Sequence, residues 1–248
     1  MMVETKSDEG VRLAKRVAEL VPCSRGEAER YIAGGWVSVD GVVQEDPATR
    51  VTPGQQVVLL PNAKAEEPAP VTILLHKPSG VNGGVGMRGA NALERLGPES
   101  LVATHGAPRF LKRHLARLTL CTPLETDASG LVVYTQDFRV ARKLVDDAVR
   151  VEYEYVAEVD GGIKDGGLAL LNHGLTFNRK PIAPMKVSWQ SEGRLRFAAK
   201  GVVPGQIEHM CAEVGLTLTE LKRLRVGRIP MAGLLEGHWR YLAEYERF

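Results

Sequence analysis

Apolar and polar positions repeat with clear periods near the N-terminus of the chain. Leu13, Val17 and Leu20 recur at the spacing of one helix face. A second helix is expected to begin at Ser24, because a serine followed three residues later by Glu27 forms a capping box. The stretch WVSVDGVV then places alternating residues on both sides of an Asp-Gly pair, which predicts a β-hairpin. We therefore expect two short helices and a small sheet before residue 61.

Longer strand-like runs dominate the rest of the sequence. Residues 73–75 and the stretch LVVYT are short apolar runs, and YEYVAEVDGG, KPIAPMKVSW and RLRFAAK also have strand character. QIEHMCAEVG instead places Ile207, Met210 and Cys211 on one face of a helix. Strands in series with occasional helices indicate an α+β fold with a larger mixed, mainly antiparallel β-sheet domain.

A change of composition divides these two parts. The stretch PNAKAEEPAP, residues 61–70, is rich in Pro, Ala and Glu and has no periodic apolar signal. Such a composition is typical of a semi-extended linker. The predicted organisation is a small domain at residues 10–60, a linker at 61–70 and a larger domain at 71–248.

The composition of the 248 residues is that of an ordinary globular protein. Hydrophobic residues make up 44%, charged residues 25%, and the net charge is +2. A nucleic-acid partner would therefore need a local basic surface. The three cysteines are far apart, and no stretch has the length of a membrane span or the form of a signal peptide. We expect a cytoplasmic monomer without membrane contact.

Several cofactor patterns are absent from the sequence. The glycine-rich turn VNGGVG is not followed by the helix and acidic residue of a dinucleotide site. The six histidines show no metal-ligand spacing. We expect neither a metal nor an organic cofactor.

The stretch CTPLETDASGLVVYT is the strongest candidate for chemistry. Its polar, turn-forming part leads directly into a strand, and reacting groups often lie at such a junction. Glu125 is its central carboxylate. From the residues alone it is either a working residue or an ordinary loop acid, and an acid pair with Glu208 for glycoside-type chemistry is a weaker alternative.

The small domain resembles the S-four domain, an RNA-binding module named after a ribosomal protein. The stretch CSRGEAERYIAGGWVSVDGVV is the most specific part of this resemblance. It implies that one surface faces an RNA backbone, which suits cationic side chains and helix N-termini. The alternative is a solvated helix face. The implied RNA-binding residues are Arg12, Lys15, Arg16, Ser24, Arg25 and Arg30.

The larger domain resembles the pseudouridine synthases that act on ribosomal RNA, in the branch with an N-terminal S-four domain. The motifs HKPSG, PLETDASGLVVYTQD, YEYVAEVDG and LKRLRVGRI occur in the order of that family. The resemblance places Glu125 at the catalytic aspartate and Tyr155 at the tyrosine that stacks on the target base. Asp127 matches a second acid common in this branch. Lys77 is expected near the same site, as an RNA-binding residue.

Three positions depart from the family pattern. Glu125 stands for aspartate, Pro123 for the arginine that fills the space of the flipped uridine, and Glu208 for the arginine that pairs with the catalytic aspartate. The resemblance implies isomerisation of uridine to pseudouridine in structured RNA, with ribosomal RNA as the expected class. The three departures predict weak or absent activity. A non-catalytic RNA-binding homologue, such as a ribosome assembly factor, is the alternative.

A basic segment near the C-terminus provides a further candidate RNA contact. Arg223, Arg225 and Arg228 surround Leu224 and Val226, which predicts a strand with a basic edge. The alternative is solvated charge. Likewise, Tyr155 could be a core aromatic of its strand.

Overall fold

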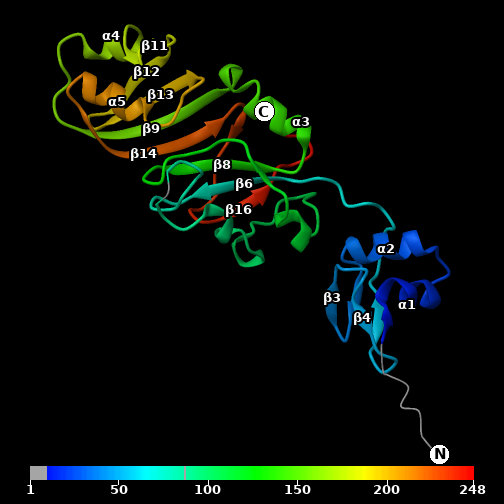
Figure 1. Cartoon of the computed structure of the whole chain (residues 1–248). Helices are drawn as coiled ribbons and strands as arrows, with labels where there is room; N and C mark the ends of the chain where they lie inside the picture. The colour runs from blue at the N-terminus through cyan, green and yellow to red at the C-terminus, as the bar shows by residue number, and fades with distance from the viewer. Residues whose placement is uncertain (1–9, 87) are drawn as a thin grey trace, which may run out of the picture. The chain divides into compact units, whose positions relative to one another are not determined.

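The computed structural model describes residues 10–86 and 88–248, and this part of the chain forms two compact units (Figure 1). The first unit ends at Ala69 and also includes Phe110–Arg113. The second unit consists of Pro70–Arg109 and His114–Phe248. None of the helices in the described ranges has the length and apolar content needed to cross a membrane.

The first unit packs two helices against short strands. Leu13, Val17, Ala28, Ile32 and Val37 are buried in its core. The strands form a sheet of order β3-β2-β5 and a separate β1–β4 pair. The elements are β1 (Val11–Arg12), α1 (Leu13–Leu20), α2 (Arg25–Ala33), β2 (Val37–Val39), β3 (Val42–Gln44), β4 (Arg50–Val51) and β5 (Val57–Leu59).

Two local sequence patterns determine where α2 begins and where the hairpin of the first unit turns. The Ser24 hydroxyl accepts a 3.2 Å hydrogen bond from the amide of Glu27, whose carboxylate accepts one of 2.8 Å from the amide of Ser24. The capping box therefore begins α2 as predicted. At the hairpin, Asp40 and Gly41 both adopt positive φ angles, of 50° and 81°, as a tight two-residue turn requires. The hairpin between β2 and β3 is confirmed.

The second unit is built on a large, mainly antiparallel sheet. Its strands are β6 (Thr72–Lys77), β7 (Thr119–Leu120), β8 (Ser129–Thr135), β9 (Glu152–Asp160), β12 (Lys186–Ser191), β13 (Arg194–Lys200), β14 (Thr217–Val226), β15 (Ile229–Pro230) and β16 (Trp239–Tyr241). The order is β12-β13-β9-β14-β8-β6-β16, with β15 paired to β14 and β7 to β8. β8 and β14 run parallel, and the other pairs are antiparallel. The α+β fold class is confirmed.

Helices and short elements surround this sheet (Figure 1). α4 contacts β12, α5 contacts β14, and α3 contacts β8. The predicted apolar face of α5, Ile207, Met210 and Cys211, is buried. The elements are α3 (Phe138–Val145), α4 (Gly167–Asn172), α5 (Gln206–Glu213), the pair β10 (Thr176–Phe177) and β11 (Lys180–Pro181), and the 3₁₀ turns η1 (Ala92–Arg95), η2 (Pro98–Ser100), η3 (Lys112–Leu115) and η4 (Ala148–Arg150).

One glycine sets the close contact between the two parallel strands. Gly130 on β8 lies opposite Arg223 on β14 and has a φ angle of 118°. A Cβ atom there would lie 2.3 Å from the carbonyl oxygen of Arg223. Only glycine allows the two strand backbones to lie this close. Their close packing brings the loop before β8 next to β14.

Candidate active site

Glu125 lies in the loop before β8, where it contacts the start of α5. The preceding residue, Leu124, is buried. Its amide donates a 3.0 Å hydrogen bond to the carbonyl of Gly83. The Glu125 side chain is half-buried. Its Oε1 atom accepts a 2.7 Å hydrogen bond from the amide of Gly205, the N-cap residue of α5. The carboxylate is therefore held at the positive end of a helix.

Tyr155 lies beside an arginine rather than on an open surface. It is on β9 opposite Arg223 of β14, and only 4% of it is exposed. The guanidinium carbon of Arg223 lies 6.0 Å from the Tyr155 ring centre and 5.6 Å from that of Tyr153. Burial raises the pKa of Tyr155, Arg223 opposes this shift, and the charge of Glu125 adds to it. Glu125, Tyr155 and Arg223 thus share one electrostatic environment.

Arg223 clamps the loop before β8 to the sheet. Its Nε donates to the Leu131 carbonyl at 2.7 Å, Nη1 to the Pro123 carbonyl at 3.0 Å, and Nη2 to the Thr122 carbonyl at 2.6 Å. All three nitrogens of the guanidinium are engaged, and the residue is 2% exposed. In this conformation the Arg223 side chain is bonded inside the domain, and its contact with RNA stays a prediction.

A bulge in β14 explains why the arginines of this strand point to different faces. The register against β9 shifts between Arg223 and Arg225, so that Arg223 lies opposite Tyr155 and Arg225 opposite Glu154. Arg223 accordingly enters the domain, whereas Arg225 pairs with Glu152 at 2.5 Å and Glu154 at 3.1 Å. A regular two-residue alternation would have kept both arginines on one face.

Lys77 is also a buried structural cation and not a surface one. It is 0% exposed, and its ammonium donates to the carbonyls of Pro78, Val81, Thr126 and Ala128. Burial and the positive charge of Arg223 lower its pKa to about 8, so that the ammonium persists at neutral pH. Lys77 lies close enough to Glu125 for the charge of that carboxylate to act on it, and RNA contact by Lys77 stays a prediction.

Glu208 lies on the helix that contacts Glu125 but is itself exposed. It occupies the first turn of α5, three positions beyond Gly205. Its charge contributes to the raised pKa of the buried Cys211 thiol. The described residues show no hydrogen bond between Glu208 and Glu125; the contact to Glu125 from this helix comes from the Gly205 amide. Pro123 and Asp127 are both exposed in the loop before β8.

The predicted RNA-binding residues of the first unit lie on α1 and α2 or at their N-caps. Arg12, Lys15, Ser24, Arg25 and Arg30 are exposed, and Arg16 is half-buried. Arg25 pairs with Glu29 at 2.9 Å, and the Nε of Arg30 donates to the Ala65 carbonyl at 2.8 Å. The Ser24 hydroxyl is engaged in the capping box. Arg16 pairs with Glu19 at 3.8 Å, and Arg12 and Lys15 are exposed to an anionic ligand.

Two functional features were not predicted from the sequence. The Gly205 amide binds the Glu125 carboxylate through the backbone. In the sequence, only the position of Gly205 as N-cap of α5 indicates such a contact. The clamp made by Arg223 depends on the bulge in β14, for which the sequence has no recognisable signal. Among the described residues, no group of three His, Cys, Asp or Glu side chains is arranged to hold a metal ion.

Comparisons with known proteins show what this chain is similar to. The S4 domain family matches residues 11–57. The chain is 29% identical over 250 residues to the ribosomal large subunit pseudouridine synthase B of Bacillus subtilis, with coverage of 95% of this chain and 93% of the relative. It is 27% identical over 247 residues to the dual-specificity RNA pseudouridine synthase RluF of Escherichia coli strain K12, covering 96% and 78%.

A third relative and a solved structure extend the comparison. An uncharacterized RNA pseudouridine synthase of Aquifex aeolicus is 27% identical over 240 residues, covering 95% of this chain and 94% of the relative. The crystal structure of a pseudouridylate synthase has the same fold, with a TM-score of 0.59 at 18% identity, covering 95% of this chain and 97% of the other. The chain is therefore similar over nearly its whole length to RNA pseudouridine synthases, and it carries an S4 domain at its N-terminus.

Proposed function

We propose that this protein binds structured ribosomal RNA and forms little or no pseudouridine. Residues 10–60 anchor the RNA, and residues 71–248 receive it at the Glu125 site. The observation that carries the proposal is the 2.7 Å hydrogen bond from the Gly205 amide to Glu125, in a site where position 208 is an exposed glutamate. The carboxylate has a backbone partner in place of the expected arginine.

The length of the Glu125 side chain argues against efficient chemistry. One additional methylene extends the carboxylate by roughly 1.5 Å, and misplacement by about 1 Å can lower a rate by about a hundredfold. The Gly205 amide gives Oε1 a single hydrogen bond, whereas an arginine partner would give the carboxylate a charge-assisted and bidentate pair. Arg223 does not replace that partner, because its three nitrogens are bonded to carbonyls of residues 122, 123 and 131.

The RNA-binding part of the proposal rests on the first unit. α1 and α2 present accessible cations, and the S4 domain family matches this segment. The relatives RluF and synthase B are named as RNA and ribosomal pseudouridine synthases, which supports ribosomal RNA as the partner. The free thiols Cys23, Cys121 and Cys211 suit a reducing compartment, so we propose the cytoplasm as its location and a monomer as its state.

A working uridine isomerase is the second candidate function. It is favoured by the shared environment of Glu125, Tyr155 and Arg223, because an acid, a tyrosine and a guanidinium meet beside one loop. In that case Glu125 would act on the ribose or base of a uridine extruded from its stack. Pseudouridine mapping of treated RNA distinguishes the two candidates.

The proposed RNA binding is tested with purified full-length protein and ribosomal RNA transcripts. Affinity is expected to fall about 10³-fold or more over a modest rise in salt if several phosphates are neutralised. Reversing Arg12, Arg16 and Arg25 to Glu should weaken binding to every transcript. The matched control reverses the exposed Arg179, Lys180 and Lys186, which carry the same total charge. Binding that is insensitive to both salt and the first triple variant would contradict the proposal.

A further inference from the structure

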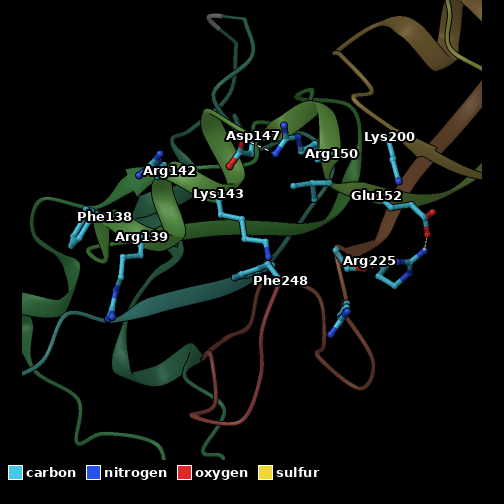
Figure 2. Close-up of a pocket in the computed structure, with 13 residues that line it drawn as sticks. Phe138, Arg139, Arg142, Lys143, Asp147, Arg150, Glu152, Lys200, Arg225 and Phe248 are labelled. Atoms are coloured by element: carbon cyan, nitrogen blue, oxygen red, sulfur yellow. Dashed lines mark hydrogen bonds and ion pairs between the residues drawn. The ribbon is translucent and has the colours of Figure 1, made fainter.

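A second basic site lies in the larger unit, away from Glu125. A pocket of about 700 Å³ opens between α3, η4 and the turn after β14. Figure 2 shows cations from α3 on one side of it and Lys200 and Arg225 on the other. The volume is in the range of pockets that bind small organic ligands, so it can accept a nucleotide unit.

Positive charge dominates this pocket. Seven cationic side chains and two carboxylates line it, an excess greater than the net charge of +2 for the whole chain. The cations are Arg225 and the exposed residues Arg139, Arg142, Lys143, Arg150, Lys200 and Arg228. The local field therefore attracts an anion, although the overall composition does not.

Several of these cations have no carboxylate partner in the part of the chain that the structure describes. Arg139 pairs with Asp137 at 3.1 Å, Arg150 with Asp147 at 3.8 Å, and Arg225 with Glu152 at 2.5 Å. Within residues 10–86 and 88–248, the structure shows no ion pair for the other four, which are Arg142, Lys143, Lys200 and Arg228. Like charges gathered without compensation repel one another, and an anionic ligand would relieve that repulsion.

Helix α3 gives this charge a regular spacing. Arg139, Arg142 and Lys143 lie at positions i, i+3 and i+4, so one helix face carries all three. Phe138 at the start of the helix is 75% exposed, although it is a large aromatic side chain. Cations beside an exposed aromatic ring are the features with which proteins hold single-stranded nucleic acid, because phosphates meet the cations and bases stack on the ring.

The pocket is separate from the Glu125 site. Glu125 precedes β8 and α3 follows it, so the seven residues of that strand lie between them. At about 3.3 Å per residue this is a separation of roughly 20 Å. An RNA chain bound at Glu125 would need several further nucleotides to reach α3.

We propose that this pocket binds the phosphodiester backbone of a single-stranded RNA segment and that Phe138 stacks on one of its bases. The inference rests on the proposed RNA binding and adds a contact surface outside the S4 domain and the Glu125 site. The phosphates would lie against Arg142, Lys143 and Lys200, whose side chains are exposed and have no ion-pair partner among the described residues. The pocket would thereby fix where the RNA leaves the larger unit.

The test measures RNA affinity of the full-length protein over a range of salt. The variant Arg142→Glu with Lys143→Glu is compared with Lys180→Glu with Lys186→Glu, which changes the same charge at exposed positions elsewhere. The pocket variant should bind at least about tenfold more weakly at about 0.1 M salt, with a salt slope shallower by about two. Phe138→Ala should weaken binding about tenfold, and Phe138→Trp should restore it.

Each outcome decides a distinct point. A wild-type protein that binds RNA while the pocket variant and Phe138→Ala bind equally well would overturn this inference and leave the proposed function intact. Absence of RNA binding by the wild-type protein would overturn both. Calorimetric binding of inorganic phosphate that the pocket variant abolishes, with RNA affinity unchanged, would show a small-anion site instead. Thermal unfolding of each variant confirms that these exposed substitutions leave the fold intact.

Discussion

The amide of Gly205 and the carboxylate of Glu125 are joined by a 2.7 Å hydrogen bond, although 80 residues separate them in sequence. This bond links the loop before β8 to the N-terminus of α5. An aspartate at position 125 would be shorter by one methylene and would not reach the same amide without movement of the loop. The glutamate therefore has a local structural role that an aspartate would not fill in this chain.

Glu125→Asp is expected to destabilise the larger unit without creating activity. The shorter side chain loses its bond to Gly205, and a hydrogen bond of this kind contributes about 1 kcal/mol to the free energy of unfolding. Urea unfolding measures the change. Asp127→Glu, at an exposed acid of the same loop, is the control and should be nearly neutral. Equal stability of Glu125→Asp and wild type would show that the Gly205 contact is unimportant.

Lys77→Met should be strongly destabilising. The substitution removes the ammonium that binds the carbonyls of Pro78, Val81, Thr126 and Ala128, and these acceptors stay in the interior. Losing a buried charged partner costs about 3 kcal/mol or more of the free energy of unfolding. Denaturant unfolding of Lys77→Met is compared with that of Lys186→Met, an exposed lysine. A loss below about 0.5 kcal/mol, typical of surface positions, would contradict the buried role of Lys77.

Stability should depend on pH through Glu154. Its carboxylate accepts hydrogen bonds from Arg196 at 2.8 Å and Arg225 at 3.1 Å, and these arginines hold its pKa below the ordinary value of 4.5. A lowered folded-state pKa adds stability above the unfolded value, and this stability disappears as the pH falls through the folded value. Glu154→Gln should therefore lose less stability than wild type between about pH 7 and about pH 3. If the free energies of unfolding of Glu154→Gln and wild type changed with pH in parallel, this role of Glu154 would be refuted.

The sequence was sufficient wherever a local signal determines the structure. The capping box at Ser24 and the Asp40-Gly41 hairpin are formed within a few residues, and both occur as predicted. The apolar face of α5 was also correctly predicted, because its period is strong. Leu20, by contrast, is 49% exposed, and it is the last residue of α1.

The site was less predictable because it depends on long-range geometry. Arg223 enters the domain only because a bulge shifts the register between it and Arg225. Lys77 lies in a fully buried strand, where four carbonyls from residues 78–128 converge on it. Side-chain type alone indicated surface cations for both residues. Contacts between positions 50 to 100 residues apart are not encoded in any local pattern.

The joint repair of the site tests which departures disable it. Glu125→Asp shortens the carboxylate, Glu208→Arg supplies its partner and Pro123→Arg supplies the residue that fills the space of the base. Arg223 bonds the backbone carbonyl at position 123, so the Pro123→Arg change retains that acceptor. Each single change should have little effect on pseudouridine formation, because the effects of substitutions at residues that act as a unit are strongly non-additive. The triple variant should form pseudouridine where each single variant does not.

Chemical mapping of pseudouridine in ribosomal RNA incubated with the wild-type protein decides whether Glu125 supports isomerisation. We expect that RNA binding is retained and that little or no pseudouridine forms, while the triple variant Pro123→Arg, Glu125→Asp, Glu208→Arg forms more. Robust pseudouridine formation by the wild-type protein that is abolished by Glu125→Ala would show instead that the longer carboxylate works.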